Sequence, residues 1–388
     1  MIEEQKKLIP FIIGGILLYL LSASVSYAAF RFLSGPVIPG LISPLPVEEA
    51  RTRVDLTAPK TEACPLNGKM FTLGEKQIWQ KWRPLTVMLE NHADARPQSG
   101  LSKADVVYEA VAEGGITRFL AVYYCGAAAE DVLIGPVRSA RTYYLDLASE
   151  YGDYPLYAHV GGANKPGPAN ALGQIGSYGW LAKGNDLNQF SLGFPTFWRD
   201  YERLGRPVAT EHTMYTTTDK LYEVAHQRGL DAKDDEGNQW DENWQSWRFK
   251  DDASERGDVG DIKFNFWSGY EEYEVNWQYD QGNNQYLRFN GGQAHKDLNN
   301  EEQLKAKVII VQFMREKGPI DELKHLLYTT TGTGKAIVFQ DGQAIQATWA
   351  KAKRQDRTVF KDSKGKEIEL NRGPIWIEIV PAGKEVSY

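Results

Sequence analysis

An uncharged and mostly apolar run from Leu8 to Phe30 constrains this chain of 388 residues more than any other feature. A helix of roughly 20 apolar residues is long enough to cross the hydrocarbon core of a bilayer. Lys6 and Lys7 precede the run and Arg31 follows it, and Lys and Arg set the orientation of such helices. We therefore predict a single-pass helix in the cytoplasmic membrane within residues 1–33, with the bulk of the chain extracytoplasmic.

A cleavable signal peptide is the alternative for this run. The small residues at 22–24 and 26–28 resemble a cleavage signal. However, the apolar part exceeds the roughly 7–15 residues that are usual for such a signal, which favours an uncleaved anchor. Since no cysteine lies near the end of the run, a lipid-modified N-terminal cysteine is not expected.

Charge limits the partners of the remaining chain. The formal net charge is −7 and the pI is near 5.6, whereas nonspecific binding to nucleic acid needs a concentrated basic surface. We therefore expect a membrane partner through the N-terminal helix and no nucleic acid. With 42% hydrophobic residues, including 20 Tyr and 11 Trp, the chain is able to build a packed core and is long enough for two domains.

Two cysteines are present, Cys64 and Cys125. Outside the cytoplasm such a pair forms a disulfide, and we favour that pairing over two unrelated thiols. Two cysteines alone cannot build a structural zinc site, and the six histidines have no spacing typical of metal ligands. The sequence therefore predicts neither a metal site nor a cofactor.

Composition divides the chain into an anchor and four further segments. Residues 34–80 form a stalk that is rich in proline up to about Lys60. An α+β domain with the candidate ligand site follows at 81–230, then an acidic linker with three tryptophans at 231–261, and a β-rich domain at 262–388.

In the first domain, β-branched and aromatic residues predict buried strands at 84–91, 117–125 and 154–161. Residues 105–113 fit a strand or a helix. Gly135-Pro136 opens a predicted helix to about Tyr151, because proline suits the first turn, and a second helix covers 220–228. This domain is therefore α+β or α/β.

The second domain shows repeated short strands. Asp341-Gly342 is a strong hairpin signal between two of them. The predicted strands are 262–267, 273–279, 285–289, 308–313, 336–340, 343–349, 358–361, 367–370 and 375–380. They predict a nearly all-β domain, either a small sandwich or a barrel.

The strongest group of candidate functional residues lies around Arg138 and Arg141. Three positions apart, they would share one face of the predicted helix, in the first turns, where unpaired N–H groups favour an anion. An anionic ligand would neutralise them. The alternative is an internal ion pair with Glu109, Glu113 or Asp146.

Further polar residues lie beside glycines at strand ends. Glu113 precedes Gly114-Gly115 and a strand that carries Arg118, and His159 precedes Gly161-Gly162. Glu113 and His159 are the candidate acid and base, although a lone histidine beside a buried strand is also typical of a structural role. The predicted ligand-binding residues are Asn91, Arg96, Arg118, Arg138 and Arg141.

At these residues the chain resembles a known family. The segments PLTVMLENHADARPQSGLSKADVVYEAVAEGGITRFLAVYY, IGPVRSARTYYLDLA and YAHVGGA are similar to the N-terminal domain of the YerB-like lipoproteins, and VIIVQF, DGQAIQATW and GPIWIEIVP to their C-terminal domain. The resemblance covers roughly residues 80 to 385. It implies a bacterial cell-envelope protein on the outer face of the cytoplasmic membrane, and it brings no established reaction.

The family's motif positions coincide with the residues selected above: Asn91, Arg96, Glu113, Arg118, Arg138, Arg141 and His159. Our first hypothesis is an anchored envelope protein whose N-terminal domain binds an anionic ligand, namely a cell-wall glycan, a carboxylate or a phosphate. The alternatives are a wall-polymer hydrolase or transferase and a non-catalytic adaptor. The expected partners are accordingly peptidoglycan or cell-wall synthesis proteins.

Overall fold

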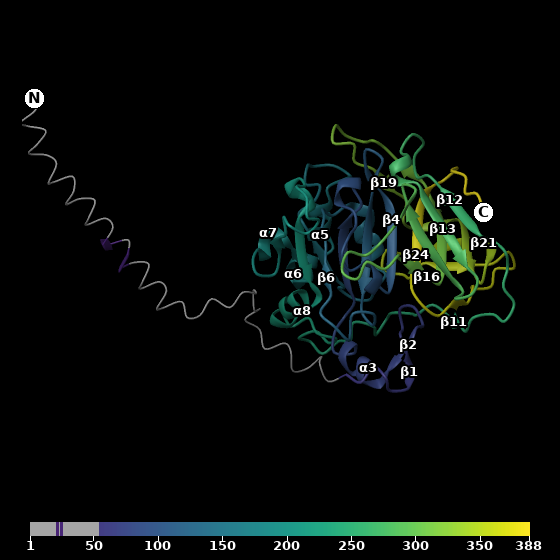
Figure 1. Ribbon diagram of the computed structural model, residues 1–388, viewed down its shortest axis with the longest axis horizontal. Coiled ribbons are helices and arrows are strands. Elements are labelled where there is room, and N and C mark those ends of the chain that lie inside the picture. The colour runs from purple at the N-terminus through teal and green to yellow at the C-terminus, as the bar shows by residue number, and fades with distance from the viewer. Residues whose placement is uncertain (1–20, 23, 26–53) are drawn as a thin grey trace, which may run out of the picture. The chain divides into compact units, whose positions relative to one another are not determined.

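A ten-stranded mixed sheet runs through the computed structural model, and its strands come from both halves of the chain (Figure 1). Each of the two predicted domains contributes five strands, and more residues lie in strands than in helices. In spatial order the strands are β22 (Val359–Lys361), β21 (Gln343–Lys351), β20 (Gly332–Gln340), β17 (Val308–Met314), β24 (Ile375–Pro381), β4 (Val106–Glu113), β5 (Ile116–Tyr123), β3 (Leu85–Glu90), β7 (Leu156–His159) and β8 (Asp186–Asn188).

The two halves meet where β24 pairs in parallel with β4, with Ile375 opposite Val106 and Glu378 opposite Glu109. The expectation that the C-terminal strands close into their own sandwich or barrel is therefore wrong. The physical reason is that β17 and β24 are apolar and buried along nearly their whole length. Such strands need cover on both faces and a partner on each edge, as in the centre of a large sheet.

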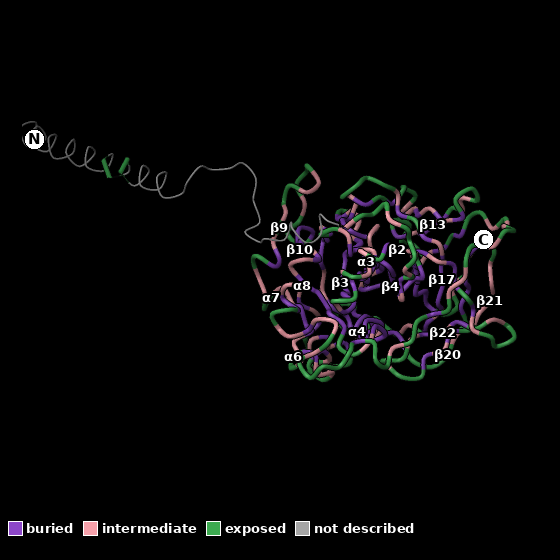
Figure 2. The backbone as a smooth tube through the Cα atoms, turned by 90° about the horizontal axis from the view of Figure 1, so that it is seen from below, coloured by how far each residue is buried: buried purple, intermediate pink, exposed green. Residues whose placement is uncertain are grey.

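The segment 105–113, which fitted a strand or a helix, is the strand β4. A two-residue turn joins it to β5, and both turn residues, Gly114 and Gly115, have positive φ angles of 57° and 81°. Turns of this kind match the twist of antiparallel strands. Both strands are buried, in the centre of the body (Figure 2).

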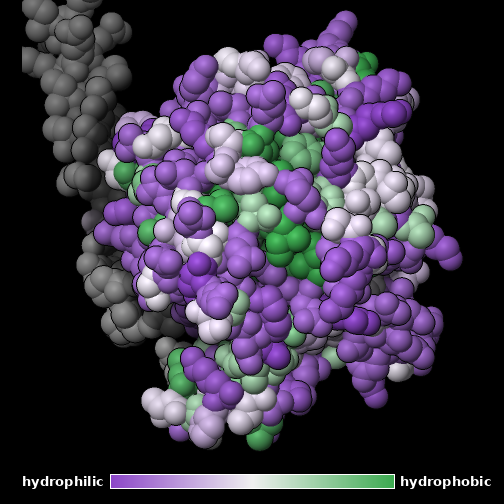
Figure 3. Space-filling view, turned by 90° about the vertical axis from the view of Figure 1, so that its right-hand side faces the viewer, coloured by the Kyte–Doolittle hydropathy of each residue, from purple (hydrophilic) through white to green (hydrophobic). Residues whose placement is uncertain are grey.

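A smaller antiparallel sheet packs on one face of the large sheet. Trp277 of its second strand lies 5.2 Å from Trp376 of β24, measured between ring centroids. The face of the molecule on the right of Figure 1 is mostly hydrophilic with a small apolar centre (Figure 3). The strands of the smaller sheet are β12 (Asp261–Phe264), β13 (Val275–Asp280), β14 (Gln285–Asn290) and β15 (Gln293–Ala294), with β16 (Lys305–Ala306) also paired to β14.

The opposite face of β4 carries α4 (Thr142–Ala148), whose Tyr143 and Tyr144 donate their hydroxyls to the carbonyls of Val111 and Ala110. Four further helices lie together on the left of the body in Figure 1, where α6 and α7 contact β8. They are α5 (Ala171–Ser177), α6 (Trp180–Lys183), α7 (Gln189–Leu192) and α8 (Thr218–Gln227), accompanied by a three-stranded sheet of β6 (Leu133–Ile134), β10 (Met214–Thr217) and β9 (Trp198–Arg199).

The end of the predicted stalk is folded. Residues 60–79 form β1 (Lys60–Ala63), β2 (Met70–Thr72) and α3 (Leu73–Trp79). Thr72 and Glu75 make a reciprocal capping box at the start of α3. The stalk therefore does not reach residue 80, because this stretch has its own helix signals and buries Trp79 in the core.

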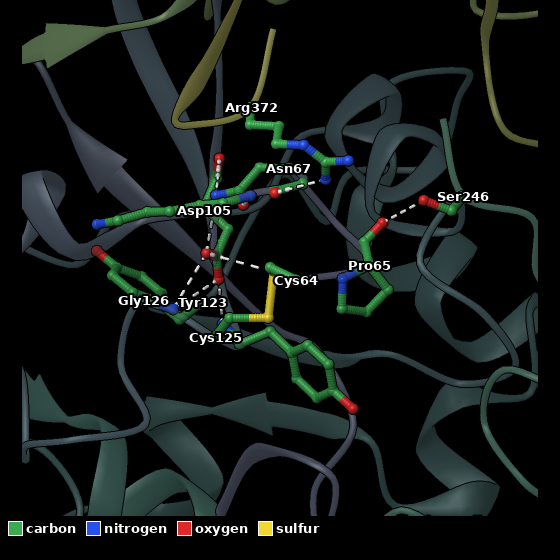
Figure 4. Close-up of a disulfide and its surroundings, with 12 residues drawn as sticks. Cys64, Pro65, Asn67, Asp105, Tyr123, Cys125, Gly126, Ser246 and Arg372 are labelled. Carbon is green, nitrogen blue, oxygen red and sulfur yellow. Dashed lines mark hydrogen bonds between the residues drawn. A yellow bond between two sulfur atoms is a disulfide. The ribbon is translucent and has the colours of Figure 1, made fainter. Parts of the chain in front are cut away.

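A disulfide fixes this N-terminal segment to the sheet. Cys64 is bonded to Cys125, just after β5, with their Cα atoms 5.9 Å apart. Asp105 lies beside the bond (Figure 4) and accepts from the backbone N–H groups of Tyr124 and Gly126. Burial raises the pKa of Asp105 to about 6.

The acidic segment 231–261 also packs against the body. Trp240 and Trp247 are buried, and the Trp247 indole donates to the carbonyl of Thr358. Within the segment, β11 (Phe249–Lys250) pairs with β23 (Leu370–Asn371), while β18 (Glu316–Lys317) pairs with β19 (Leu327–Tyr328) further on.

The structure describes residues 21–22, 24–25 and 54–388. Those from 54 onward belong to one compact unit. The predicted anchor and most of the stalk lie outside the described residues, apart from four exposed helical positions between 21 and 25. Among the residues described, none of the helices has the length and apolar character needed to span a membrane.

Candidate functional site

The candidate residues gather at one edge of the large sheet, where β3, β4 and β7 end and β5 begins. β3 and β7 are parallel, and Arg118 of β5 lies opposite Glu90, the last residue of β3. Glu113 is the last residue of β4. In open sheets the carboxyl ends of parallel strands are where ligands commonly bind. We call this group, with residues 138–141 beside it, the arginine edge.

The segment that carries Arg138 and Arg141 is extended, so the prediction that both lie on a helix is wrong. The N–H of Arg138 donates to the carbonyl of Met88, 2.8 Å away, and its own carbonyl accepts from Val160 at 3.1 Å. The segment thus bonds to β3 and to the end of β7 instead of to itself. Helix α4 begins only at Thr142, with Arg141 as its N-cap.

Glu113 is shared by two arginines. Arg141 donates to it from Nε and Nη2, at 3.0 and 2.7 Å, and Arg118 donates to its other oxygen. Arg118 and Arg141 also donate to the carbonyls of Ser139 and Ala140. Burial alone would raise the pKa of Glu113, but the two guanidiniums outweigh burial and the pKa lies below its usual range. Glu113 is therefore a carboxylate.

Glu90 is the second shared carboxylate. Arg138 donates to it from Nε at 3.0 Å, and His212 Nδ1 lies 2.8 Å from its other oxygen. This bond raises the pKa of His212, although burial opposes the shift. Glu90 itself is buried, whereas a quarter of the Arg138 side chain is exposed. An anion therefore reaches this cluster most directly at Arg138.

Sequence reasoning assigned no role to Glu90 or His212. His212 ends the short helix η3 (Thr210–His212), and 122 positions separate the two residues in the chain. The only local signal was the polar pair Glu211-His212 before strand β10.

His159 is fully buried at the end of β7. Its ring nitrogens lie 2.7 Å from Asp186 Oδ1 and 2.6 Å from the carbonyl of Gly161. Both nitrogens are thus engaged inside the protein. Because Glu113 is also held by two arginines, this geometry gives neither residue the open position that an acid or base needs beside a substrate.

Asn91 and Arg96 belong to a different, buried network. Asn91 donates to Glu109 and Thr117 at 3.0 and 2.7 Å and accepts from Arg96 Nε at 3.0 Å. Arg96 also donates to the carbonyl of Glu272. These two predicted ligand residues therefore take part in a network that reaches the segment before β13, although Asn91 directly follows Glu90 in the chain.

Comparisons with known proteins agree with this architecture. The N-terminal domain of a protein of unknown function (DUF3048) matches residues 72–231, and the C-terminal domain of the same family matches residues 262–377. The "Putative lipoprotein YerB" of Bacillus subtilis (strain 168) is 29% identical over 327 residues, which cover 84% of this chain and 88% of that protein. The crystal structure of the Bacillus subtilis YerB protein matches with a TM-score of 0.66 at 27% identity, covering 84% of this chain and all of that one.

Proposed function

Since this chain belongs to the DUF3048 family, we propose that it is a membrane-anchored protein of the bacterial cell envelope that binds an anionic ligand at its arginine edge. The ligand class is a carboxylate or phosphate, as in wall peptides and wall polymers. One observation carries the proposal: three arginines at this edge share two buried or half-buried carboxylates, Glu90 and Glu113.

The surplus guanidinium has a physical consequence. A buried cation without a full counter-charge is costly, and an anionic ligand removes that cost. Arg138 is the most exposed of the three and uses Nε for Glu90. Its planar guanidinium has further donors suited to a carboxylate or phosphate.

Two features support the anchored location. The relative from Bacillus subtilis is named as a lipoprotein. In this chain both cysteines are joined in the disulfide, and the apolar run Leu8–Phe30 offers a helix in place of a lipid. In cells, the protein should sediment with membranes, resist a high-salt wash and be digested by protease added to protoplasts. A salt-released or protease-resistant protein would contradict the location.

The binding test uses the full-length chain in detergent, titrated at low ionic strength with inorganic phosphate and with soluble muropeptides. Arg138→Gln should weaken binding about tenfold or more, because a charge-assisted hydrogen bond contributes roughly 1.5–3 kcal/mol. Arg372→Gln is the matched control, since Arg372 makes a similar Nε bond to Asp251 and is similarly exposed. Equal affinity of the Arg138 variant and the parent would overturn the proposal.

An adaptor for wall-synthesis proteins is the second candidate function. Phe190 and Phe194 expose more than three quarters of their surface, and Phe190 lies against Gly161 at this edge. Exposed aromatic side chains are typical of protein contacts. Crosslinking in cells should capture a wall-synthesis protein with the parent and lose it with Phe190→Ser and Phe194→Ser. An unchanged pattern would exclude this role for the two residues.

A further inference from the structure

Two histidines and an aspartate converge next to Glu90. One ligating atom each of His92, Asp94 and His212 lies within 4.8 Å of the others. The only comparable group among the described residues is Cys64, Asp105 and Cys125, whose sulfurs are already bonded to each other. Imidazole and carboxylate are ligands that suit zinc and similar divalent metals.

The local backbone holds these side chains in place. His92 caps the short helix η1 (Ala93–Ala95), and its Nδ1 accepts from the N–H of Asp94 at 3.2 Å. This bond holds the backbone of Asp94 beside the ring, and an ion bound at Nδ1 would take the place of this N–H. The rings of His92 and His212 stack at 4.9 Å between centroids and 22° between planes, so two elements far apart in the chain bring their imidazoles together. In this arrangement the nitrogen lone pairs lie in nearly parallel planes, and a rotation of the His92 ring, which is one-third exposed, would direct both toward one ion.

His212 has the environment of a metal ligand. Its Nδ1 is bonded to Glu90, which leaves Nε2 for an ion. Histidines that bind metals almost always donate their other nitrogen to a carboxylate or carbonyl. The ligands of one zinc ion lie roughly 3.3 Å apart, given zinc–nitrogen distances of about 2.0 Å. The side chain of Asp94 is two-thirds exposed and is able to close the remaining gap.

Two exposed carboxylates lie beside the two histidines. Asp94 is one of the three candidate ligands, and Glu211 interacts electrostatically with His212, Arg138 and His92. Arg206 donates to the backbone carbonyl of Asp94, so cations lie at this group as well. A divalent ion held here would strengthen the field on an anion at Arg138.

We propose that His92, Asp94 and His212 bind a divalent transition-metal ion such as Zn²⁺, and that this ion assists the binding of an anion at Arg138. The metal site depends only on the three side chains. The assistance of anion binding rests on the anion-binding function proposed above. The metal is therefore tested without an anion, so that the failure of one proposal can be told from the failure of the other.

For the test, the full-length chain is first treated with a chelator, which is then removed. ZnCl₂ binding is measured by calorimetry, and Co²⁺ binding by visible absorption. We expect one ion per chain. His92→Gln and Asp94→Asn should each weaken binding about tenfold or more, since each removes one of the three protein ligands. Both residues are partly or fully exposed, so these variants should fold. His212→Gln should abolish the Co²⁺ spectrum.

His226→Gln is the matched control, because His226 is an exposed histidine paired with Asp231. Unchanged zinc affinity in the His92 and Asp94 variants, or an equal loss in the His226 variant, would overturn the metal site. Phosphate titration with and without Zn²⁺ tests the assistance of anion binding. The parent should bind phosphate more tightly with zinc, and Asp94→Asn should not. Zinc binding with no change in phosphate affinity would overturn the proposal that the ion assists anion binding.

Discussion

Arg288 of β14 donates from Nη1 to Glu378 of β24 across 2.8 Å, and neither side chain has any exposed surface. Arg288 also donates to Glu109 of β4, and its guanidinium lies 4.5 Å from the ring centroid of Trp376. One cation therefore joins the smaller sheet to the two strands at which the halves of the large sheet meet. This network belongs to the fold, because no member is open to solvent.

The first prediction concerns the removal of this cation. Arg288→Leu removes the buried cation that contacts both Glu109 and Glu378, and leaves their carboxyl oxygens without this donor. Breaking a buried ion pair by removing one partner costs about 3–5 kcal/mol, and we expect a loss of that size in the free energy of unfolding. Denaturant titration of the full-length chain measures it. Arg372→Leu removes an exposed pair with Asp251 and should cost less than about 1 kcal/mol; similar losses in both variants would contradict this assignment.

The second prediction concerns pH. Burial raises the pKa of Glu378 to about 8; Arg288 opposes the shift and Glu109 adds to it. The folded state thus holds a proton that the unfolded chain releases above about pH 4.5. By linkage, this group stabilises the fold fully below about pH 4.5, and the contribution is lost as pH rises to about 8.

Glu378→Gln keeps a neutral side chain at every pH. Its stability should therefore fall less than that of the parent between pH 5 and 8, and at neutral pH it should be tolerated. Denaturation midpoints at several pH values for both proteins give this difference. Parallel curves would show that Glu378 is ionised in the fold.

Strand positions followed from local sequence, whereas strand partners did not. Apolar runs predicted β3, β5, β17 and β24, and Asp341-Gly342 predicted the β20–β21 hairpin, since these signals are confined to adjacent residues. The pairing of Ile375 with Val106 joins residues from opposite ends of the body. No local pattern encodes such a pair, so the single large sheet could not be predicted.

The arginine edge was predictable only in part. An ion pair between Arg141 and Glu113 was one of the alternatives considered from the sequence. The partner of Arg138 was missed, because Glu90 looked like the end of an ordinary strand. The helix predicted from Gly135-Pro136 failed for a related reason, since β3 and the end of β7 supply the backbone partners of Arg138. Tertiary hydrogen bonds overrode the local signal there.

The third prediction concerns Asp105, whose neighbours are donors. Its carboxylate accepts from the N–H of Tyr124 at 2.8 Å, from Gly126 at 3.0 Å and from Asn67 Nδ2 at 3.0 Å. Asp105→Asn would turn an amide N–H₂ toward at least one of these donors. We expect a loss of about 1–3 kcal/mol in the free energy of unfolding, although the shape is unchanged. A neutral result by thermal or chemical denaturation would show that Asp105 is already protonated.

The fourth prediction concerns the disulfide between Cys64 and Cys125, which are separated by 61 positions. Closing a loop of this length restricts the unfolded chain, and the chain-entropy model gives about 4 kcal/mol. The double variant Cys64→Ser, Cys125→Ser should unfold at a lower temperature than the parent. Reductant should lower the midpoint of the parent and leave the variant unchanged. A parent insensitive to reductant under unfolding conditions would argue against a covalent link.

The fifth prediction separates stability from binding at the arginine edge. Glu113→Gln removes one of two carboxylates, so Arg118 and Arg141 lose their shared counter-charge while both are more than nine-tenths buried. Stability should fall by about 3 kcal/mol. Phosphate affinity should rise, because the surplus positive charge grows by one and the added anion compensates it. The increase should shrink at high salt, which screens the exposed part of this interaction.

The control variant Arg138→Gln should change phosphate affinity in the opposite direction. If Glu113→Gln weakens phosphate binding in a chain that still folds, the carboxylate holds the arginines in the binding geometry and the effect of charge alone is the smaller one.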